Sequence, residues 1–231
     1  MRKMLTVLIL LGLVAIALPM TAAALGLDVE AKAGAGLGLG STDNKDVTGS
    51  PRMATGAGVN IDVFLLSLGS AELGISAGAE YSHMTFHSTW SNFMSTGSDQ
   101  TQDSTYGYFN VPISLVCSIP VNQSIKVVVR AGGFIGSYLA GFSDLTYNPE
   151  IPFVLVNGRQ PLDSTNTIKM NYGLHFTAGT DIGLGGGLAV APAIQFDWGL
   201  TDVTKNTPQA GSFKDTLWAL TVVVGIKYSV L

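Results

Sequence analysis

The sequence predicts an all-β protein, an eight-stranded antiparallel transmembrane up-and-down β-barrel with long extracellular loops and short periplasmic turns. Three observations predict this fold class: an export signal at the N-terminus, eight stretches of alternating apolar and polar residues, and connections that alternate between long and short. In such a barrel every second side chain of a strand faces lipid and the others face the interior, which produces the alternation.

The export signal occupies residues 1–24. Arg2 and Lys3 precede an apolar stretch from Met4 to Leu18, and small residues before position 25 form a cleavage site. The alternative, an uncleaved transmembrane anchor, is disfavoured because the apolar core is short for the roughly 20 residues that span a bilayer. We therefore expect a secretory signal peptide at 1–24 and one outer-membrane β-barrel domain at 25–231.

The composition agrees with export to a membrane. Hydrophobic residues make up 47% of the chain and charged residues only 12%, yet no apolar run after the signal approaches the length of a membrane helix. The net charge is −4, and no basic cluster remains after the signal, so nucleic acid is excluded as a partner. Cys117 is the only cysteine, so no disulfide framework is expected.

The first four alternating stretches place apolar or aromatic residues on one parity and polar residues or glycines on the other. In chain order they are about 25–39, with Leu27, Val29 and Leu37 on the apolar parity; about 54–66, with Val59, Ile61 and Val63; about 71–87, with Leu73, Ile75 and Tyr81; and about 105–117, with Phe109, Val111 and Ile113. Each exceeds the 9–11 residues that a tilted membrane strand needs.

The last four stretches continue this pattern to the end of the chain. They are about 124–140, with Ile125, Val127 and Val129 on the apolar parity; about 167–182, with Tyr172, Leu174 and Phe176; about 187–200, with Ile194, Phe196 and Trp198; and the terminal strand, with Trp218, Val222 and Tyr228. We expect the terminal strand to close the barrel against the first, so that Lys227 meets Asp28 or Glu30 in the interior.

The connections between these stretches alternate in length. Polar segments at about 40–53, 88–104, 141–166 and 201–213 are long, whereas the links around Ser67–Ser70, Ser118–Gln123 and Gly183–Gly186 are short. Bacterial barrels have long extracellular loops and short periplasmic turns. The predicted location is the bacterial outer membrane, with the loops exposed at the cell surface and both termini in the periplasm.

Aromatic residues gather near the strand ends, where their rings suit the membrane–water interface. The predicted aromatic girdle consists of Trp90, Tyr108, Tyr138, Trp198, Trp218 and Tyr228.

Charged residues and one histidine occupy the inward parity. They are Asp28, Glu30, Lys32, Asp62, Glu80, Lys126, Arg130, Lys169, His175, Asp181, Asp197 and Lys227. An eight-stranded barrel is only wide enough for side chains to fill it, and buried charges must be paired. We expect a structural network of ion pairs that plugs the lumen, in preference to a narrow pore or a proton path.

The sequence does not indicate an enzyme. His83 and His87 are four residues apart on a strand, where that spacing does not make the adjacent pair of ligands that a helix provides, and no nucleophile motif accompanies His175. The glycine run at 183–187 lies between two strands and lacks the lysine of a phosphate-binding loop. No catalytic residue, metal or cofactor is expected.

Three segments carry a resemblance to a known family: Ala193–Val203, Tyr108–Leu115 and Gly225–Tyr228. They are similar to the outer-membrane β-barrel domain of the porin-like superfamily, in particular to its PorT-like small barrels. The resemblance covers the mature chain and implies a small integral outer-membrane barrel, without implying one activity. The chain departs from such barrels by continuing past Tyr228 to Leu231, where an aromatic residue often ends the final strand.

The expected function is that of a small integral outer-membrane barrel with a filled lumen and a surface-exposed structural, adhesion or recognition role. The alternative is a narrow porin-like or hydrophobic-solute transport barrel, with a lateral opening as one route. A soluble lipocalin-like barrel would reverse the two parities. Expected partners are outer-membrane lipid, the barrel-assembly machinery, and host or surface ligands contacted through loops 88–104 and 141–166.

Overall fold

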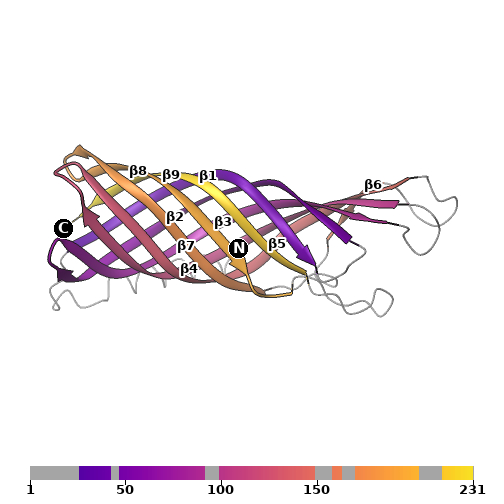
Figure 1. Ribbon diagram of the computed structural model, residues 1–231, viewed down its shortest axis with the longest axis horizontal. Helices are drawn as coiled ribbons and strands as arrows, with labels where there is room; N and C mark the ends of the chain where they lie inside the picture. The colour runs from indigo at the N-terminus through magenta and orange to yellow at the C-terminus, as the bar shows by residue number, and fades with distance from the viewer. Residues whose placement is uncertain are drawn as a thin grey trace.

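The computed structural model describes residues 26–42, 47–91, 99–148, 158–162, 170–202 and 215–230, and every regular element among them is a β-strand (Figure 1). The predicted signal peptide lies outside these residues. The strands are β1 (Gly26–Thr42), β2 (Val47–Leu68), β3 (Ala71–Trp90), β4 (Asp99–Pro120), β5 (Ile125–Asn148), β6 (Gly158–Pro161), β7 (Met170–Gly185), β8 (Leu188–Gly199) and β9 (Asp215–Ser229). Among the described residues no helix is long and apolar enough to cross a membrane.

Eight of these strands close into a ring, which confirms the predicted barrel. The order around the ring is β1-β2-β3-β4-β5-β7-β8-β9, all pairs are antiparallel, and β9 returns to pair with β1. The four-residue β6 pairs with the outer part of β5. The register sets Glu30 opposite Lys227, so the predicted closure of the terminal strand against the first is correct.

The side chains alternate between the interior and the outer surface in the predicted phase. On β1, Asp28, Glu30 and Lys32 are buried, whereas Val29 and Leu37 are 40% and 53% exposed. On β4, Leu115 reaches 72% exposure. The outer surface is therefore apolar around the ring, as expected for a barrel that faces lipid, and the alternative of a soluble barrel with a reversed phase is wrong.

The strands on one side of the barrel are much longer than a membrane crossing requires. Strands β2 to β5 contain 20 to 24 residues, whereas β8 contains 12. At the right-hand end of Figure 1 the long strands project beyond the ring together with β6. Three of the four connections between ring strands at this end are longer than any at the opposite end, so we call it the loop end and the opposite end the turn end.

The predicted long connections were partly wrong, because strands extend into them. Residues 47–53, 88–90, 99–104 and 141–148 are paired strand residues. Their Ser, Thr and Asn content indicates contact with water, but it does not prevent a ladder when the neighbouring strand also continues. The rest of these connections, and most of 201–213, lies outside the described residues.

Tight turns join the strands at the turn end, close to the predicted positions. Gly69 has φ 66° in the β2–β3 turn, and Gly186 and Gly187 have φ 61° and 80° in the β7–β8 turn. These left-handed conformations favour glycine, which has no Cβ to clash.

Bulges interrupt the ladders and change which residues face inward. Between Gly107 and Tyr108 of β4, the register on β5 skips Leu139, so Tyr138 lies opposite Tyr108 and Ala140 opposite Gly107. An extra residue in one strand is a β-bulge. On β5, even-numbered residues consequently face inward up to Tyr138, and odd-numbered residues face inward beyond the bulge.

The same region of β5 is where its neighbour changes. Its pairing with β7 ends at Ser137 opposite Met170, and its pairing with β6 begins at Phe142 opposite Pro161. Residues 138–141 therefore have no ladder partner on this side among the described residues. The Tyr138 hydroxyl donates to the Leu162 carbonyl at 2.5 Å, and the Leu162 amide donates to the Gly141 carbonyl at 3.0 Å.

Candidate functional site in the barrel interior

The interior near the turn end holds a group of ion pairs, which we call the turn-end cluster: Asp28, Glu30, Asp62, Arg130, Asp181 and Lys227. Arg130 donates two hydrogen bonds to Asp62, Nε to Oδ1 at 3.1 Å and Nη2 to Oδ2 at 2.7 Å. Arg130 Nη2 also donates to Glu30 Oε2 at 2.6 Å. The paired planar geometry of guanidinium and carboxylate favours this arrangement.

Lys227 completes the turn-end cluster from the terminal strand. Its Nζ lies 2.7 Å from Asp181 Oδ2, 3.4 Å from Asp62 Oδ2 and 3.7 Å from Asp28 Oδ2. The predicted contact with Asp28 is present, although the shortest contact is with Asp181. Asp62 thus joins the two cations into one connected network that ties five strands together.

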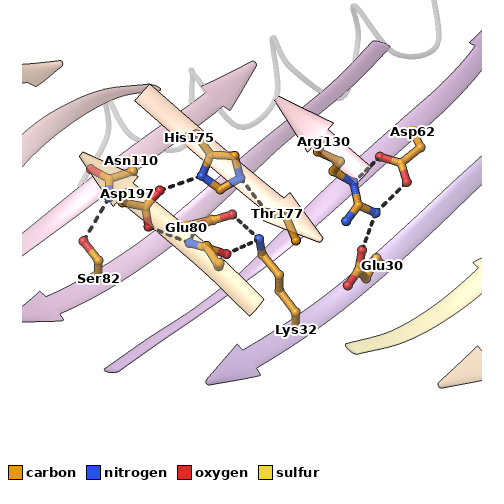
Figure 2. Close-up of polar contacts among 11 residues, drawn as sticks. Glu30, Lys32, Asp62, Glu80, Ser82, Asn110, Arg130, His175, Thr177 and Asp197 are labelled. Carbon is orange, nitrogen blue, oxygen red and sulfur yellow. Dashed lines mark hydrogen bonds and ion pairs between the residues drawn. The ribbon is translucent and has the colours of Figure 1, made fainter. Parts of the chain in front are cut away.

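The middle of the interior holds a second network, the central cluster: Lys32, Glu80, His175, Thr177, Gln195 and Asp197 (Figure 2). Lys32 Nζ lies 2.5 Å from Glu80 Oε1 and donates to Gln195 Oε1 at 2.8 Å. The Gln195 amide donates to Glu80 Oε2 at 3.0 Å and to Asp197 Oδ2 at 2.7 Å. Gln195 therefore links the two carboxylates of the cluster.

A histidine ends the central cluster on its β7 side. His175 Nδ1 lies 2.6 Å from Asp197 Oδ1, and its Nε2 lies 3.2 Å from the Thr177 hydroxyl. A hydroxyl, an imidazole and a carboxylate in a row resemble the arrangement of a nucleophilic site. Thr177 is only 3% exposed, however, and the adjoining cavity of about 30 Å³ has room for water but not for a substrate.

Above the central cluster, towards the loop end, the interior becomes apolar. The loop-end aromatic cluster consists of Ala54, Met84, Tyr106, Tyr108, Leu217 and Ala219, with Phe86, Tyr138 and Leu162 packed against it. The Phe86 and Tyr106 rings stack at 5.6 Å, and Tyr138 meets Tyr108 edge to face at 5.7 Å. The lumen is thus filled at three successive levels.

Glycines on neighbouring strands make room for the polar side chains of the interior. Gly58 lies directly opposite Glu80, and Gly136 lies directly opposite Asn110. A Cβ on Gly136 would collide with the Asn110 amide oxygen, and a Cβ on Gly58 would collide with the Glu80 side chain. Each of these side chains therefore lies flat across its neighbouring strand instead of extending to the barrel axis.

The structure places the predicted interior residues as follows. Asp197 is partly buried. Nine others are buried, with 7% exposure or less: Asp28, Glu30, Lys32, Asp62, Glu80, Arg130, His175, Asp181 and Lys227. Lys126 lies at the turn-end mouth, with its side chain 43% exposed and 3.6 Å from Glu72. Lys169 lies outside the described residues. The described interior therefore contains six acids and only three permanent cations.

The aromatic girdle prediction was wrong for Tyr108 and Tyr138. Tyr108 is fully buried in the loop-end aromatic cluster, and Tyr138 contacts it there. Both lie on the inward parity of their strands, so the alternation should have outweighed their position near strand ends. Trp198 and Tyr228 are 47% and 51% exposed on the outer surface.

The other two predicted girdle residues are half-buried. Trp218 contacts the Phe196 ring at 6.2 Å, and Trp90 lies at the loop end of β3. For these residues, contact with the membrane interface stays a prediction.

Uncharged residues of the interior were missed by the sequence-based site prediction. Gln195, Thr177 and Asn110 all lie on the inward parity, and Asn110 donates to the Ser82 hydroxyl at 2.9 Å. Counting only charged residues on that parity overlooked them. The available signal was an amide on the inward parity two residues from an inward acid, as Gln195 is from Asp197.

Comparison with known proteins gives the family. The profile described as "Outer membrane protein beta-barrel domain" matches residues 23–205. No match was found among curated proteins. Among solved structures the chain is similar to OprG from Pseudomonas aeruginosa, with 13% identity, a TM-score of 0.47, and coverage of 87% of this chain and 95% of that chain.

Two further structures show comparable similarity. Neisserial surface protein A has 8% identity, a TM-score of 0.45, and coverage of 87% of this chain and 96% of that chain. The outer membrane protease OmpT from Escherichia coli has 9% identity, a TM-score of 0.46, and the same coverage of 87% and 96%. Because the family profile spans most of the sequence, the chain belongs to the outer-membrane β-barrel domain family, whose location is the bacterial outer membrane.

Proposed function

We propose that this protein is a non-conducting outer-membrane barrel that displays a recognition surface at its loop end. The observation that carries the proposal is the filled lumen. The turn-end cluster, the central cluster and the loop-end aromatic cluster occupy successive levels, and the cavity between the last two measures only about 30 Å³. Such an interior stabilises the barrel and leaves no continuous path for solutes.

The proposed orientation has the loop end outside the cell and both termini in the periplasm. Beyond the apolar belt, the outer surface of β2 to β6 carries a row of polar and charged residues. Arg52 Nε lies 3.5 Å from Asp103 Oδ1, and Arg159 Nη2 lies 3.0 Å from Asp144 Oδ2, all four on exposed side chains. A sheet with a charged outer face suits water above a membrane, and long loops of such barrels face outward.

Recognition is assigned to the loops that this projecting sheet supports. A rigid scaffold that holds loops away from the membrane is a common way to present binding residues. The proposed contacts are host or surface ligands through 88–104 and 141–166, with lipid around the belt and the barrel-assembly machinery during insertion. The proposal contains no catalytic step, because the Thr177 hydroxyl is buried.

Conductance in planar bilayers tests the filled lumen. Purified protein should give no steady ohmic current, whereas the double variant Arg130→Ser, Lys227→Ser, which empties part of the turn-end cluster, should conduct more at equal inserted amounts. Gel mobility before and after heating verifies that each preparation is folded. Ohmic current from the unaltered protein, rising in proportion to the amount inserted, would overturn the proposal.

Protease treatment of intact cells tests the orientation. Cleavage should occur within 88–104 or 141–166, and a bound surface ligand should protect the same sites. Cleavage at the turn around 121–124 would instead place the turn end outside the cell. Deleting 149–157 should remove ligand binding while leaving the heat-modifiable gel mobility intact.

A second candidate function is lateral transport of small hydrophobic solutes, favoured by the change of partner along β5. An open cavity of about 500 Å³ lies beside residues 138–141, which pair with neither β6 nor β7 in the described part of the chain, and it is lined by Tyr138, Leu139, Ala140, Pro161 and Leu162 among others. Tyr138 belongs to both this cavity and the loop-end aromatic cluster. The cavity thus adjoins the loop-end aromatic cluster through Tyr138 and Leu162.

Liposome uptake distinguishes the second candidate from the first. A fluorescent apolar probe should enter protein-containing vesicles faster than empty ones if solutes cross the wall. The variant Ala140→Trp should block this uptake, while Leu115→Trp, an equally large change on the outer surface elsewhere, should not. Equal uptake by vesicles with and without protein would exclude transport and leave the first proposal standing.

A further inference from the structure

The buried charges of the interior do not balance. Among the described residues, six buried or partly buried acids face Lys32, Arg130 and Lys227, so three negative charges lack a permanent cation. An uncompensated buried charge is costly, and proteins reduce that cost by binding protons or cations. The central cluster holds two acids, Glu80 and Asp197, and one permanent cation, Lys32, which pairs with Glu80.

The central cluster also has the donor set of a metal centre. One ligand atom from each of Glu80, His175 and Asp197 lies within 4.8 Å of the other two. The three residues come from adjacent or facing strands, β3, β7 and β8, so the barrel wall fixes their separation. Figure 2 shows their side chains converging on the same part of the lumen.

Two residues of the interior have side-chain amide oxygens without hydrogen-bond partners. Asn110 and Asn171 are 6% and 2% exposed, and the Oδ1 atom of each is buried without a hydrogen bond. Both residues line the cavity of about 30 Å³ that Glu80 and Asp197 also line. Buried polar atoms normally have a partner. The Asn110 oxygen lies against Gly136 of the neighbouring strand, which leaves the Asn171 oxygen as the one available to a cation.

We propose that the central cluster binds one divalent first-row transition-metal ion through Glu80, His175 and Asp197, with the amide oxygen of Asn171 as a further ligand. Carboxylate, imidazole and amide oxygen donors suit Zn²⁺, Fe²⁺ or Mn²⁺ rather than soft metals. The ion supplies positive charge beside the two carboxylates and a partner for the Asn171 oxygen.

Lys32 makes a sharp prediction possible, because its ammonium contacts Glu80 at 2.5 Å and competes with the ion for that carboxylate. The substitution Lys32→Gln should therefore tighten metal binding. If the network were purely structural, Lys32→Gln would destabilise the protein without increasing its affinity for metal.

The chain offers a matched control on its outer surface. His87 Nδ1 lies 2.9 Å from Asp103 Oδ1, and His87 Nε2 lies 3.3 Å from the Thr89 hydroxyl. This row repeats the His175–Asp197–Thr177 geometry, but among the described residues no third donor joins it to form a metal-binding group. Asp103→Asn is therefore the control for Asp197→Asn.

The test titrates folded, metal-free protein in detergent with Zn²⁺ by calorimetry and with Co²⁺ by its visible absorption, which reports ligand type. We expect one ion per chain. Asp197→Asn should weaken the affinity on the order of tenfold or more, and Asn171→Ala about tenfold. Lys32→Gln should tighten binding, and Asp103→Asn should leave it unchanged. If Asp197→Asn fails the gel-mobility test for folding, Asn171→Ala and Lys32→Gln decide.

Three results would overturn the proposal. The first is no binding by folded unaltered protein at pH 7 to 8. The second is equal weakening by Asp103→Asn. The third is unchanged affinity in Lys32→Gln and Asn171→Ala, which would place the ion elsewhere.

Discussion

The substitution Arg130→Met tests whether the turn-end cluster stabilises the barrel. Arg130 makes three hydrogen bonds to Asp62 and Glu30, which are 1% and 2% exposed, and methionine keeps most of its volume but not its charge. Removing one partner of a buried ion pair costs about 3–5 kcal/mol. Lys227 still lies 3.4 Å from Asp62, so we expect the lower value, about 3 kcal/mol, or roughly a 150-fold change in the folding equilibrium.

Urea unfolding in lipid vesicles, followed by tryptophan fluorescence and gel mobility, measures this change. Arg159→Met, which removes an exposed partner of Asp144, is the control and should leave the unfolding curve unchanged. Adding Glu30→Gln and Asp62→Asn to Arg130→Met should restore much of the stability, because no unpaired acid then remains beside position 130. A loss below about 1 kcal/mol in Arg130→Met, or no recovery in the triple variant, would refute the reasoning.

Three further predictions concern single groups. Tyr108→Phe should leave the free energy of unfolding unchanged or slightly higher, because the buried Tyr108 hydroxyl has no hydrogen-bond partner. Tyr138→Phe should lower it by about 0.5–1.5 kcal/mol in the same urea assay, because the Tyr138 hydroxyl donates to a backbone carbonyl at 2.5 Å. Gly136→Ala should lower stability by about 1–3 kcal/mol, since the new methyl collides with the amide side chain that lies over it. The hydrogen bond from Arg159 holds the pKa of Asp144 below its ordinary value. This pair should therefore stabilise the β5–β6 pairing at pH values above the ordinary carboxyl pKa and lose that contribution as the pH falls through the lowered pKa. An NMR titration of Asp144 with and without Arg159→Met measures the shift.

The fold could be predicted because a membrane barrel imposes one simple rule on every strand. Lipid outside and a narrow interior force alternation, and that alternation has the same phase in the structure as in the sequence, from Asp28 on the first strand to Lys227 on the last. Strand ends could not be predicted in the same way. At 47–53 and 99–104 the ladder continues in water, where side-chain polarity no longer distinguishes a paired strand from a loop.

The errors inside the barrel also have physical causes. Tyr138 was assigned to the membrane interface because it lies near a strand end, but it precedes the bulge at Leu139 and keeps the inward parity of β5, so its ring lies in the loop-end aromatic cluster. The bulge itself lies in the β4–β5 ladder, and the extra residue appears only when the two strands are paired.

The charge balance of the interior was the most consequential difference between expectation and structure. Parity alone gave six acids and five bases, which predicts a nearly neutral plug. The structure removes Lys126 to the mouth, where water screens it, and Lys169 lies outside the described residues. The same parity on two strands therefore corresponds to different environments, because depth along the barrel axis decides whether a cation is buried. Among the described residues, buried acids outnumber permanent cations, and bound protons or cations lower the cost of that excess, so the filled lumen is a candidate ligand site as well as a plug.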